Sequence, residues 1–176
     1  MIILSEDIYL KPLSVEDVPY LFALIDDERD YLRQWLPFVD FTLEQQDTQN
    51  YVEYALGLSD TPQFTIYQYE RCVGLVGFKN YEPENMRIEI GYWLSQKAQG
   101  RGIMTCAVQS LLSFAFDTMK INRVSIRAAV GNVKSRRIPE KLGFTQEGIE
   151  RDGELLVDHV FTDLAVYSLL KSEFKT

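Results

Sequence analysis

The sequence predicts a single mixed α/β domain spanning residues 1–176. Two observations lead to this class. Segments with helical apolar spacing alternate with segments rich in β-branched and aromatic residues, and a hairpin lies toward each end of this pattern. The composition fits a globular protein, with 46% apolar and 25% charged residues. A chain of this length can bury roughly 70% of its unfolded surface around one core.

The first half of the chain alternates strand and helix. Residues 8–13 predict a strand, and a helix is expected to begin at Ser14, a favourable N-cap. Residues 47–58 predict a second helix. The β-branched and aromatic residues of 63–81 predict a hairpin that turns near Glu70.

The second half begins with the clearest strand pattern. Apolar residues alternate strictly with other residues over 86–94. Residues 103–119 carry an apolar stripe at helical spacing. A strand is expected over 123–130, and a short helix after Asn132 that ends at Gly143, a typical residue to follow a helix. The rest of the chain predicts strands.

A glycine turn joins the 86–94 strand to the helix that follows it. The turn is Gln99-Gly100-Arg101-Gly102. Glycines let a ligand approach the backbone closely, the first N–H groups of a helix lack acceptors, and the helix dipole attracts anions. The turn therefore predicts a phosphate site, with a plain tight turn as the alternative. It lacks the GK[ST] ending of a Walker loop and the third glycine of a Rossmann fingerprint.

The distribution of charge supports an anionic ligand at this turn. The whole chain carries a net charge of −8. Residues 97–141, however, hold nine Lys and Arg against two acids, a local charge of +7, which leaves −15 on the remainder. This asymmetry predicts an anionic partner for the basic segment and a cationic partner for the acidic remainder.

The sequence gives little support for other kinds of functional site or for a membrane or secreted protein. Cys72 and Cys106 form no disulfide framework, and His159 is the single histidine, so neither a zinc site nor a serine-histidine triad is expected. No apolar run could span a membrane, and the N-terminal segment lacks the basic residues of a secretion signal. We expect a cytoplasmic protein that does not bind membranes.

The motifs together resemble the GNAT superfamily of acetyl-CoA-dependent N-acetyltransferases, whose signature is Q/R-x-x-G-x-G/A. Residues 99–104 match it except at Met104, where the family has Gly or Ala. The segments 32–38, 88–94, 131–144 and 147–170 extend the resemblance over nearly the whole chain. They are most similar to the branch that acetylates N-terminal amines of ribosomal proteins. The implied fold is a twisted, mixed, mostly antiparallel sheet of about seven strands flanked by about four helices.

The resemblance implies acetyl-CoA as the cosubstrate, with no metal. In such enzymes the pyrophosphate lies on the amides of the glycine turn, and the pantetheine arm runs along the preceding strand as an added strand. The residues that match CoA-contacting positions are Tyr92, Trp93, Leu94, Gln99, Gly100, Arg101, Gly102, Ile103, Met104, Thr105, Asn132, Lys134 and Arg137.

Acetyl transfer needs a neutral amine, a polarised thioester carbonyl and a proton for the departing thiolate. The resemblance places the polarising backbone N–H near Tyr92 or Trp93. We expect Glu89 to act as the base, through water. The alternative is that Glu89 is a surface carboxylate paired with Arg87, which shares its strand face.

The proton donor is expected to be Ser135. Many family members carry a tyrosine as general acid seven residues after the position of Asn132, but this chain has Pro139 there. Ser135 matches the N-x-x-S pattern of the ribosomal branch, although it could also simply fill its helix. Because Pro139 removes a helical hydrogen bond from the Ser135 carbonyl, we also predict a local kink.

The resemblance suggests that Tyr31, Trp35 and Phe38 form a wall of the acceptor site; the alternative is a satellite core cluster.

The expected acceptor is a protein N-terminal amine, with a ribosomal protein as the partner. Alternatives are a small amine, such as an aminoglycoside or a polyamine, and a non-catalytic CoA-binding role. Nucleic-acid binding is disfavoured by the acidic chain and by the scarcity of aromatics in its basic segment. The apolar last strands would suit a homodimer.

Overall fold

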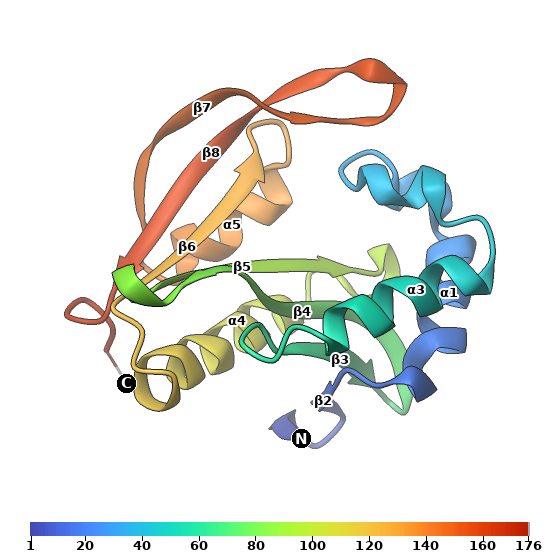
Figure 1. The fold of residues 1–176 in the computed structure, drawn as a ribbon, viewed down its shortest axis with the longest axis horizontal. Coiled ribbons are helices and arrows are strands. Elements are labelled where there is room, and N and C mark those ends of the chain that lie inside the picture. The colour runs from blue at the N-terminus through green and yellow to red at the C-terminus, as the bar shows by residue number, and fades with distance from the viewer. Residues whose placement is uncertain (176) are drawn as a thin grey trace.

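The computed structural model describes residues 1–175 and is built on one eight-stranded sheet. The strand order is β1-β2-β3-β4-β5-β6-β8-β7, and every neighbouring pair is antiparallel except β5 and β6. Figure 1 shows this sheet with helices packed along it. The mixed, mostly antiparallel sheet confirms the predicted fold class, with one strand more than expected.

The extra strand is β1 (Ile2–Ser5), which pairs with β2 (Ile8–Pro12). The central hairpin consists of β3 (Gln63–Gln68) and β4 (Arg71–Glu82), as predicted. β5 (Arg87–Leu94) pairs with β4. The strand expected from residue 86 begins one residue later, because Met86 adopts a left-handed conformation with φ of 47° and ends the preceding turn.

The last three strands form an arm that leaves the rest of the sheet. They are β6 (Arg123–Ala129), β7 (Thr145–Leu155) and β8 (Phe161–Leu170). β5 and β6 pair in parallel only where residues 87–89 meet residues 123–125. Beyond that point the two strands diverge, and Figure 1 shows β6 rising away from β5. The edge of β5 that faces β6 is therefore left without a strand partner from residue 90 onward.

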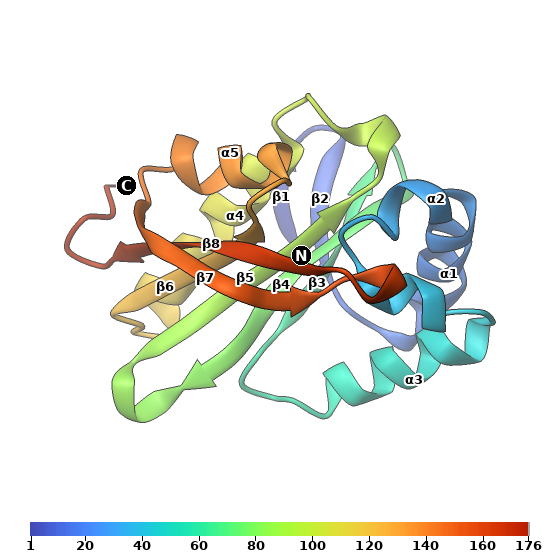
Figure 2. The same ribbon diagram turned by 90° about the horizontal axis from the view of Figure 1, so that it is seen from above.

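Helices cover both faces of the sheet. α1 (Val18–Asp27) and α3 (Gln45–Leu56) pack on the face that carries Leu75, whereas α4 (Ile103–Ser113) packs on the face that carries Val76. Because Leu75 and Val76 are consecutive in β4, they point to opposite faces. Figure 2 shows α1 and α3 lying apart from α4.

The two shortest α-helices flank the diverging strands. α2 (Arg29–Leu32) follows α1 directly, and α5 (Val133–Lys141) follows β6. Asn132 caps α5 by accepting a hydrogen bond from the Ser135 N–H at 3.2 Å. α5 continues through Pro139 as one element, and the kink predicted at this proline stays a prediction.

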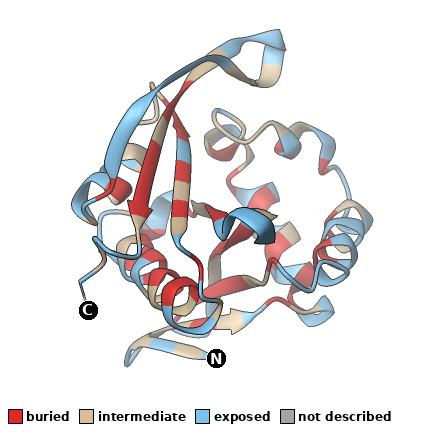
Figure 3. Ribbon diagram, turned by 60° about the vertical axis from the view of Figure 1, so that its left-hand side comes forward, coloured by how far each residue is buried: buried red, intermediate tan, exposed pale blue. Residues whose placement is uncertain are grey.

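The apolar stripe of the 103–119 segment is buried as its spacing predicts, except that Met119 at its end is only partly buried. The residues Met104, Ala107, Val108, Leu111, Leu112, Ala115 and Phe116 are each at most 5% exposed. α4 itself ends at Ser113, and residues 114–118 form a wider π-helical turn. Figure 3 shows buried residues along the central strands and mostly exposed residues along β7.

Candidate active site

Two cavities meet where β5 and β6 diverge. The first, of about 650 Å³, is lined by the side chains of Trp35, Phe38, Phe41 and Tyr51 among others, and we call it the aromatic cavity. The second, of about 610 Å³, is lined by the glycine turn and by α5, and we call it the glycine-turn cavity. The residues that line both are Trp35, Leu36, Tyr92, Trp93, Asn132 and Ser135. A ligand in either cavity would reach this shared region.

The glycine turn has the conformation that an anion site needs. Gly100 and Gly102 have φ of 78° and 76°, values that other residues adopt only with strain, and the space beside their Cα atoms is open. The first amide held within the following helix is that of Cys106, which donates to the Gly102 carbonyl at 3.0 Å. The amides just ahead of Cys106 therefore have no helical acceptor and remain able to bind an anion.

Basic side chains face the same cavity. Lys134, Arg137 and Lys141, all from α5, line it opposite the turn. The predicted cofactor residues line this cavity with one exception, Arg101, which is exposed and does not contribute to its wall. The amides, the open turn and the cations together fit a ligand with several phosphate charges.

A hydrogen-bonded network joins the turn to both flanking helices. The Gln99 side-chain amide donates to the Tyr31 hydroxyl at 2.6 Å and to the Leu94 carbonyl at 3.2 Å. Lys134 Nζ donates to Gln99 Oε1 at 3.2 Å. Gln99 thus uses its side chain to fix the turn. The structure places Tyr31 in the glycine-turn cavity and not in the aromatic cavity, where the acceptor wall was expected.

The free edge of β5 borders the glycine-turn cavity. Tyr92, Trp93 and Leu94 line it, and all three lie beyond the last residue pairing with β6. Peptide groups on this edge can therefore accept an extended ligand as an added strand. This arrangement is the one the sequence resemblance implies for a pantetheine arm.

Ser135 lies between the cavities and is held by its neighbours. Its hydroxyl donates to the Tyr92 hydroxyl at 3.3 Å, and the Tyr92 hydroxyl donates to the Ser135 carbonyl at 3.0 Å. Both residues line both cavities. A hydroxyl at this junction can reach groups in either ligand.

Glu89 is buried, with 4% of the residue exposed, and lies outside the walls of both cavities. It pairs with Lys79 at 3.1 Å and Arg127 at 3.2 Å and accepts a hydrogen bond from Asn80 at 2.9 Å. Burial alone would raise the pKa of Glu89, but the two cations and Asn80 outweigh it and lower the pKa. Arg87 pairs instead with Glu82, so the alternative interpretation of Glu89 as a surface carboxylate paired with Arg87 is wrong.

Glu154, on β7, is a carboxylate that sequence reasoning missed. It is half-buried and lines the aromatic cavity, close enough to Lys79, Arg127 and Glu89 for their charges to act on it. Burial and the charge of Glu89 raise its pKa, against the opposing effect of the two cations. No local motif marks Glu154, because the strand register of β7 and the curvature of the arm bring it to the cavity.

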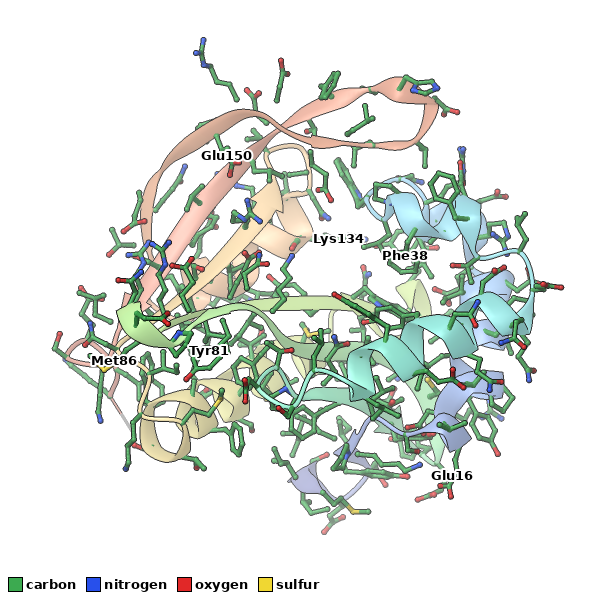
Figure 4. All side chains as sticks on the ribbon, in the orientation of Figure 1. Glu16, Phe38, Tyr81, Met86, Lys134 and Glu150 are labelled. Carbon is green, nitrogen blue, oxygen red and sulfur yellow. The ribbon has the colours of Figure 1, made fainter. Side chains whose placement is uncertain are left out.

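Aromatic side chains form much of the remaining wall. Trp35 lines both cavities and its ring packs closely against Gly131, while Phe38 lines the aromatic cavity. Sequence reasoning missed Phe41 and Tyr51. Figure 4 shows Lys134 and Phe38 on the two sides of the space above β5.

The tip of the β7–β8 hairpin is tied to the aromatic wall. Arg33 forms a bidentate pair with Asp40, both nitrogen–oxygen distances being 2.8 Å, and its guanidinium also lies 3.5 Å from Asp158 at the hairpin tip. Asp40 lies in the segment between Phe38 and Phe41. The hairpin therefore stands over the aromatic cavity as part of its enclosure, which Figure 1 shows as the long arm above β5.

The mixed sheet opens beside a glycine turn. A site that fits a polyanion lies on one side of this opening, and an aromatic cavity lies on the other. These features define the class of acyl-CoA-dependent transferases. The comparisons with known proteins agree. Residues 7–145 match the family model described as an acetyltransferase (GNAT) domain. The chain belongs to the GNAT acetyltransferase family and is an acetyl-CoA-dependent N-acetyltransferase.

Individual relatives cover nearly all of the chain. The putative ribosomal N-acetyltransferase YdaF of Bacillus subtilis (strain 168) is 35% identical over 176 residues, covering 97% of this chain and 95% of the relative. The ribosomal-protein-serine acetyltransferase of Escherichia coli (strain K12) is 29% identical, covering 93% of both. The solved structure of RimL, a ribosomal L7/L12 alpha-N-protein acetyltransferase in complex with coenzyme A, matches with a TM-score of 0.91 at 27% identity, covering 96% of this chain and 97% of that one.

Neither a membrane span nor a metal cluster was found in the part of the chain that the structure describes. Its helices are too short or too polar to cross a bilayer. Its His, Cys, Asp and Glu side chains do not gather into a group of three or more that could hold a metal ion.

The backbone of Gly102 provides a direct test of the glycine turn. Replacing Gly102 with Val puts a β-branched residue at φ of 76°, which costs about 1–2 kcal/mol or displaces the turn. We expect the dissociation constant for acetyl-CoA, measured by calorimetry, to rise about tenfold.

Gly148→Ala is the matched control for this variant. Gly148 also has open space around it, but it lies in β7 and its φ is not positive. Its acetyl-CoA affinity should equal that of the wild type. If Gly102→Val bound acetyl-CoA normally, the turn would not be the phosphate site.

Proposed function

We propose that this enzyme acetylates the N-terminal α-amine of a protein, with a ribosomal protein as the acceptor. The observation that carries the proposal is the junction of the two cavities at Tyr92, Trp93 and Ser135, where an amine from one side meets a thioester from the other. The ribosomal acceptor is supported by the activities named for the relatives from Escherichia coli and for RimL.

The aromatic cavity supports a chain terminus as the acceptor. Its wall continues onto exposed apolar side chains, since Phe38 is 40% and Phe41 is 78% exposed. Such a rim can hold residues that follow a reacting N-terminus. A compact polycation would gain no net attraction there, because Lys79 and Arg127 line the same cavity as Asp47 and Glu154 and balance their charge.

The acetyl group moves in one direct step in this proposal. The neutral amine nitrogen attacks the thioester carbonyl carbon, a C–N bond forms and the C–S bond breaks. A carboxylate takes the amine proton through water, and the Ser135 hydroxyl gives its proton to the departing thiolate sulfur. Ser135 then regains a proton from water, while the carboxylic acid releases its proton to solvent. The free N–H groups of β5 near Tyr92 and Trp93 stabilise the developing oxyanion.

Two carboxylates compete for the role of base, and we favour Glu154 over Glu89. Glu154 lines the aromatic cavity with a raised pKa, so it is a stronger base than an ordinary carboxylate. Glu89 has a lowered pKa and lies beneath Lys79 and Arg127. Glu89 then holds these two cations in place, while Glu154 accepts the proton.

A comparison of blocked and free peptides tests the acceptor. One peptide would begin with a free serine α-amine and contain one internal lysine, and its matched control would be the same peptide with a blocked α-amine. Spermidine and an aminoglycoside complete the set, and mass spectrometry locates the added acetyl group. We expect acetylation of the free α-amine alone. Preferred acetylation of lysine or of a small amine would overturn the proposed acceptor, and so would the absence of product from the peptide with the free α-amine.

The pH–rate profile tests the base. The carboxylate is the basic form, so kcat/KM should fall as the pH drops through the raised pKa of Glu154. Glu154→Gln should lower kcat/KM at the optimum by about 100-fold. It should also abolish the fall in kcat/KM at low pH that protonation of Glu154 causes.

Glu150→Gln is the matched control, because Glu150 lies on the same strand and pairs with Arg127 at 3.2 Å but does not line either cavity. It should retain the wild-type profile. If Glu89→Gln removed the acid limb and Glu154→Gln left it unchanged, Glu89 would be the base.

A further inference from the structure

Pro139 leaves one carbonyl of α5 without its helical donor. Proline has no N–H, so the carbonyl four residues earlier, that of Ser135, lacks the N–H donor that an α-helix normally supplies. The helix nevertheless continues from Val133 to Lys141. The missing donor comes from the sheet, because the Tyr92 hydroxyl donates to the Ser135 carbonyl oxygen at 3.0 Å.

The same phenol also holds the reactive end of Ser135. The Ser135 hydroxyl donates to the Tyr92 oxygen at 3.3 Å, and the Ser135 N–H donates to Asn132 Oδ1 at 3.2 Å. All three polar groups of Ser135 therefore have partners, and two of them meet on Tyr92. Two of these bonds fix the backbone of Ser135, and the third gives its hydroxyl a preferred orientation toward Tyr92.

Tyr92 makes these contacts across the opening in the sheet. It belongs to β5, whereas Ser135 belongs to the helix that follows β6, and the two strands diverge after Glu89. Burial raises the pKa of the Tyr92 phenol above its ordinary value, outweighing the hydrogen bond from Ser135, which lowers it. The phenol thus keeps its proton at neutral pH and remains a donor to the carbonyl.

We propose that Tyr92 is a positioning residue, whose hydroxyl replaces the amide hydrogen that Pro139 lacks and thereby holds Ser135 Oγ where the two cavities meet. The inference rests on the proposed function, because the orientation of Ser135 affects the rate only if its hydroxyl gives up a proton. It makes the tyrosine on β5 and the proline in α5 a coupled pair, although they lie far apart in the sequence.

A double-mutant cycle tests this coupling. Tyr92→Phe keeps the ring and removes the hydroxyl, so we expect kcat to fall about tenfold while KM for acetyl-CoA changes by no more than about twofold. Pro139→Ala supplies the missing N–H. In the Pro139→Ala background, Tyr92→Phe should lower kcat by only about threefold, because the helix itself then partners the Ser135 carbonyl.

Two further variants separate positioning from general stability. Tyr167→Phe is the matched control, since the buried Tyr167 hydroxyl also bonds to α5, through Arg136 at 2.9 Å and Glu140 at 2.8 Å, but does not touch Ser135. It should lower the melting temperature and leave kcat unchanged. In a Ser135→Ala background, Tyr92→Phe should cause no further loss of kcat.

Specific outcomes would overturn the inference. If Ser135→Ala lowers kcat and Tyr92→Phe does not, the serine is the proton donor but needs no tyrosine, and this inference alone fails. An equal effect of Tyr92→Phe in the wild-type and Pro139→Ala backgrounds would also overturn it. If Ser135→Ala itself leaves kcat unchanged, the proposed role of the serine fails and the inference fails with it.

Discussion

Replacing Ser135 with alanine is expected to lower kcat by about 100-fold, which is the lower end of the usual contribution of a positioned general acid. The hydroxyl lies at the junction of the two cavities and would protonate the departing thiolate. The helix should remain intact, because Asn132 bonds to the backbone N–H of residue 135, which alanine retains. The dissociation constant for acetyl-CoA should therefore stay within about twofold of the wild-type value.

Steady-state kinetics and calorimetry together check this result. Ser113→Ala is the matched control, since Ser113 lies on α4 and its hydroxyl bonds only to the Gln109 carbonyl of its own helix. It should behave as the wild type. Parallel losses of turnover and acetyl-CoA affinity in Ser135→Ala would make the serine a binding or structural residue.

Replacing Glu28 with alanine is expected to reduce the free energy of unfolding by about 3 kcal/mol, because one buried and one part-buried donor lose their acceptor. Glu28 is 7% exposed, and its carboxylate accepts from the Ser95 hydroxyl and from the Gln96 N–H, both at 2.6 Å. These bonds tie the start of α2 to the loop that leads into the glycine turn. The variant should therefore also bind acetyl-CoA more weakly.

Urea unfolding and acetyl-CoA titration measure the two effects. For a domain of this size the loss corresponds to a drop of roughly 9 °C in melting temperature. Glu28→Gln should lose about half as much, because its amide oxygen still accepts from one donor. The exposed neighbour Asp27 provides the control Asp27→Asn, which should be neutral. A neutral result for Glu28→Ala would show that this carboxylate does not stabilise the loop.

The parts of the fold with a regular local pattern were predictable. The strand at 87–94, the buried stripe of α4 and the β3–β4 hairpin all follow from side-chain spacing. β1 was missed because its four residues are too few to show a period and Ile3 is 65% exposed. The one-turn helix α2 was missed because so short an element is set by tertiary contacts, including the bonds of Glu28.

The candidate site likewise has one part that was predictable from the sequence and one part that was not. The glycine turn was predictable because a phosphate site can be built from consecutive backbone amides, so its signal is local in the sequence. The assignment of the base depends on which carboxylate the sheet brings to the cavity. Glu89 and Glu154 both lie in strands, and only the divergence of β5 and β6 and the register of β7 place Glu154 in the cavity wall. The link between Tyr92 and Ser135 likewise exists only in three dimensions.

Binding of bisubstrate conjugates tests the central claim most directly, namely that an N-terminal amine and acetyl-CoA meet at Ser135 and Tyr92. One conjugate would join the CoA sulfur through an acetyl linker to the α-amine of a peptide, and a second would carry spermidine in place of the peptide. Calorimetry should show the peptide conjugate binding at least about 100-fold more tightly than CoA, because both cavities are filled without a second loss of translational freedom. A spermidine conjugate that binds more tightly than the peptide conjugate, or a peptide conjugate no tighter than CoA, would contradict the account.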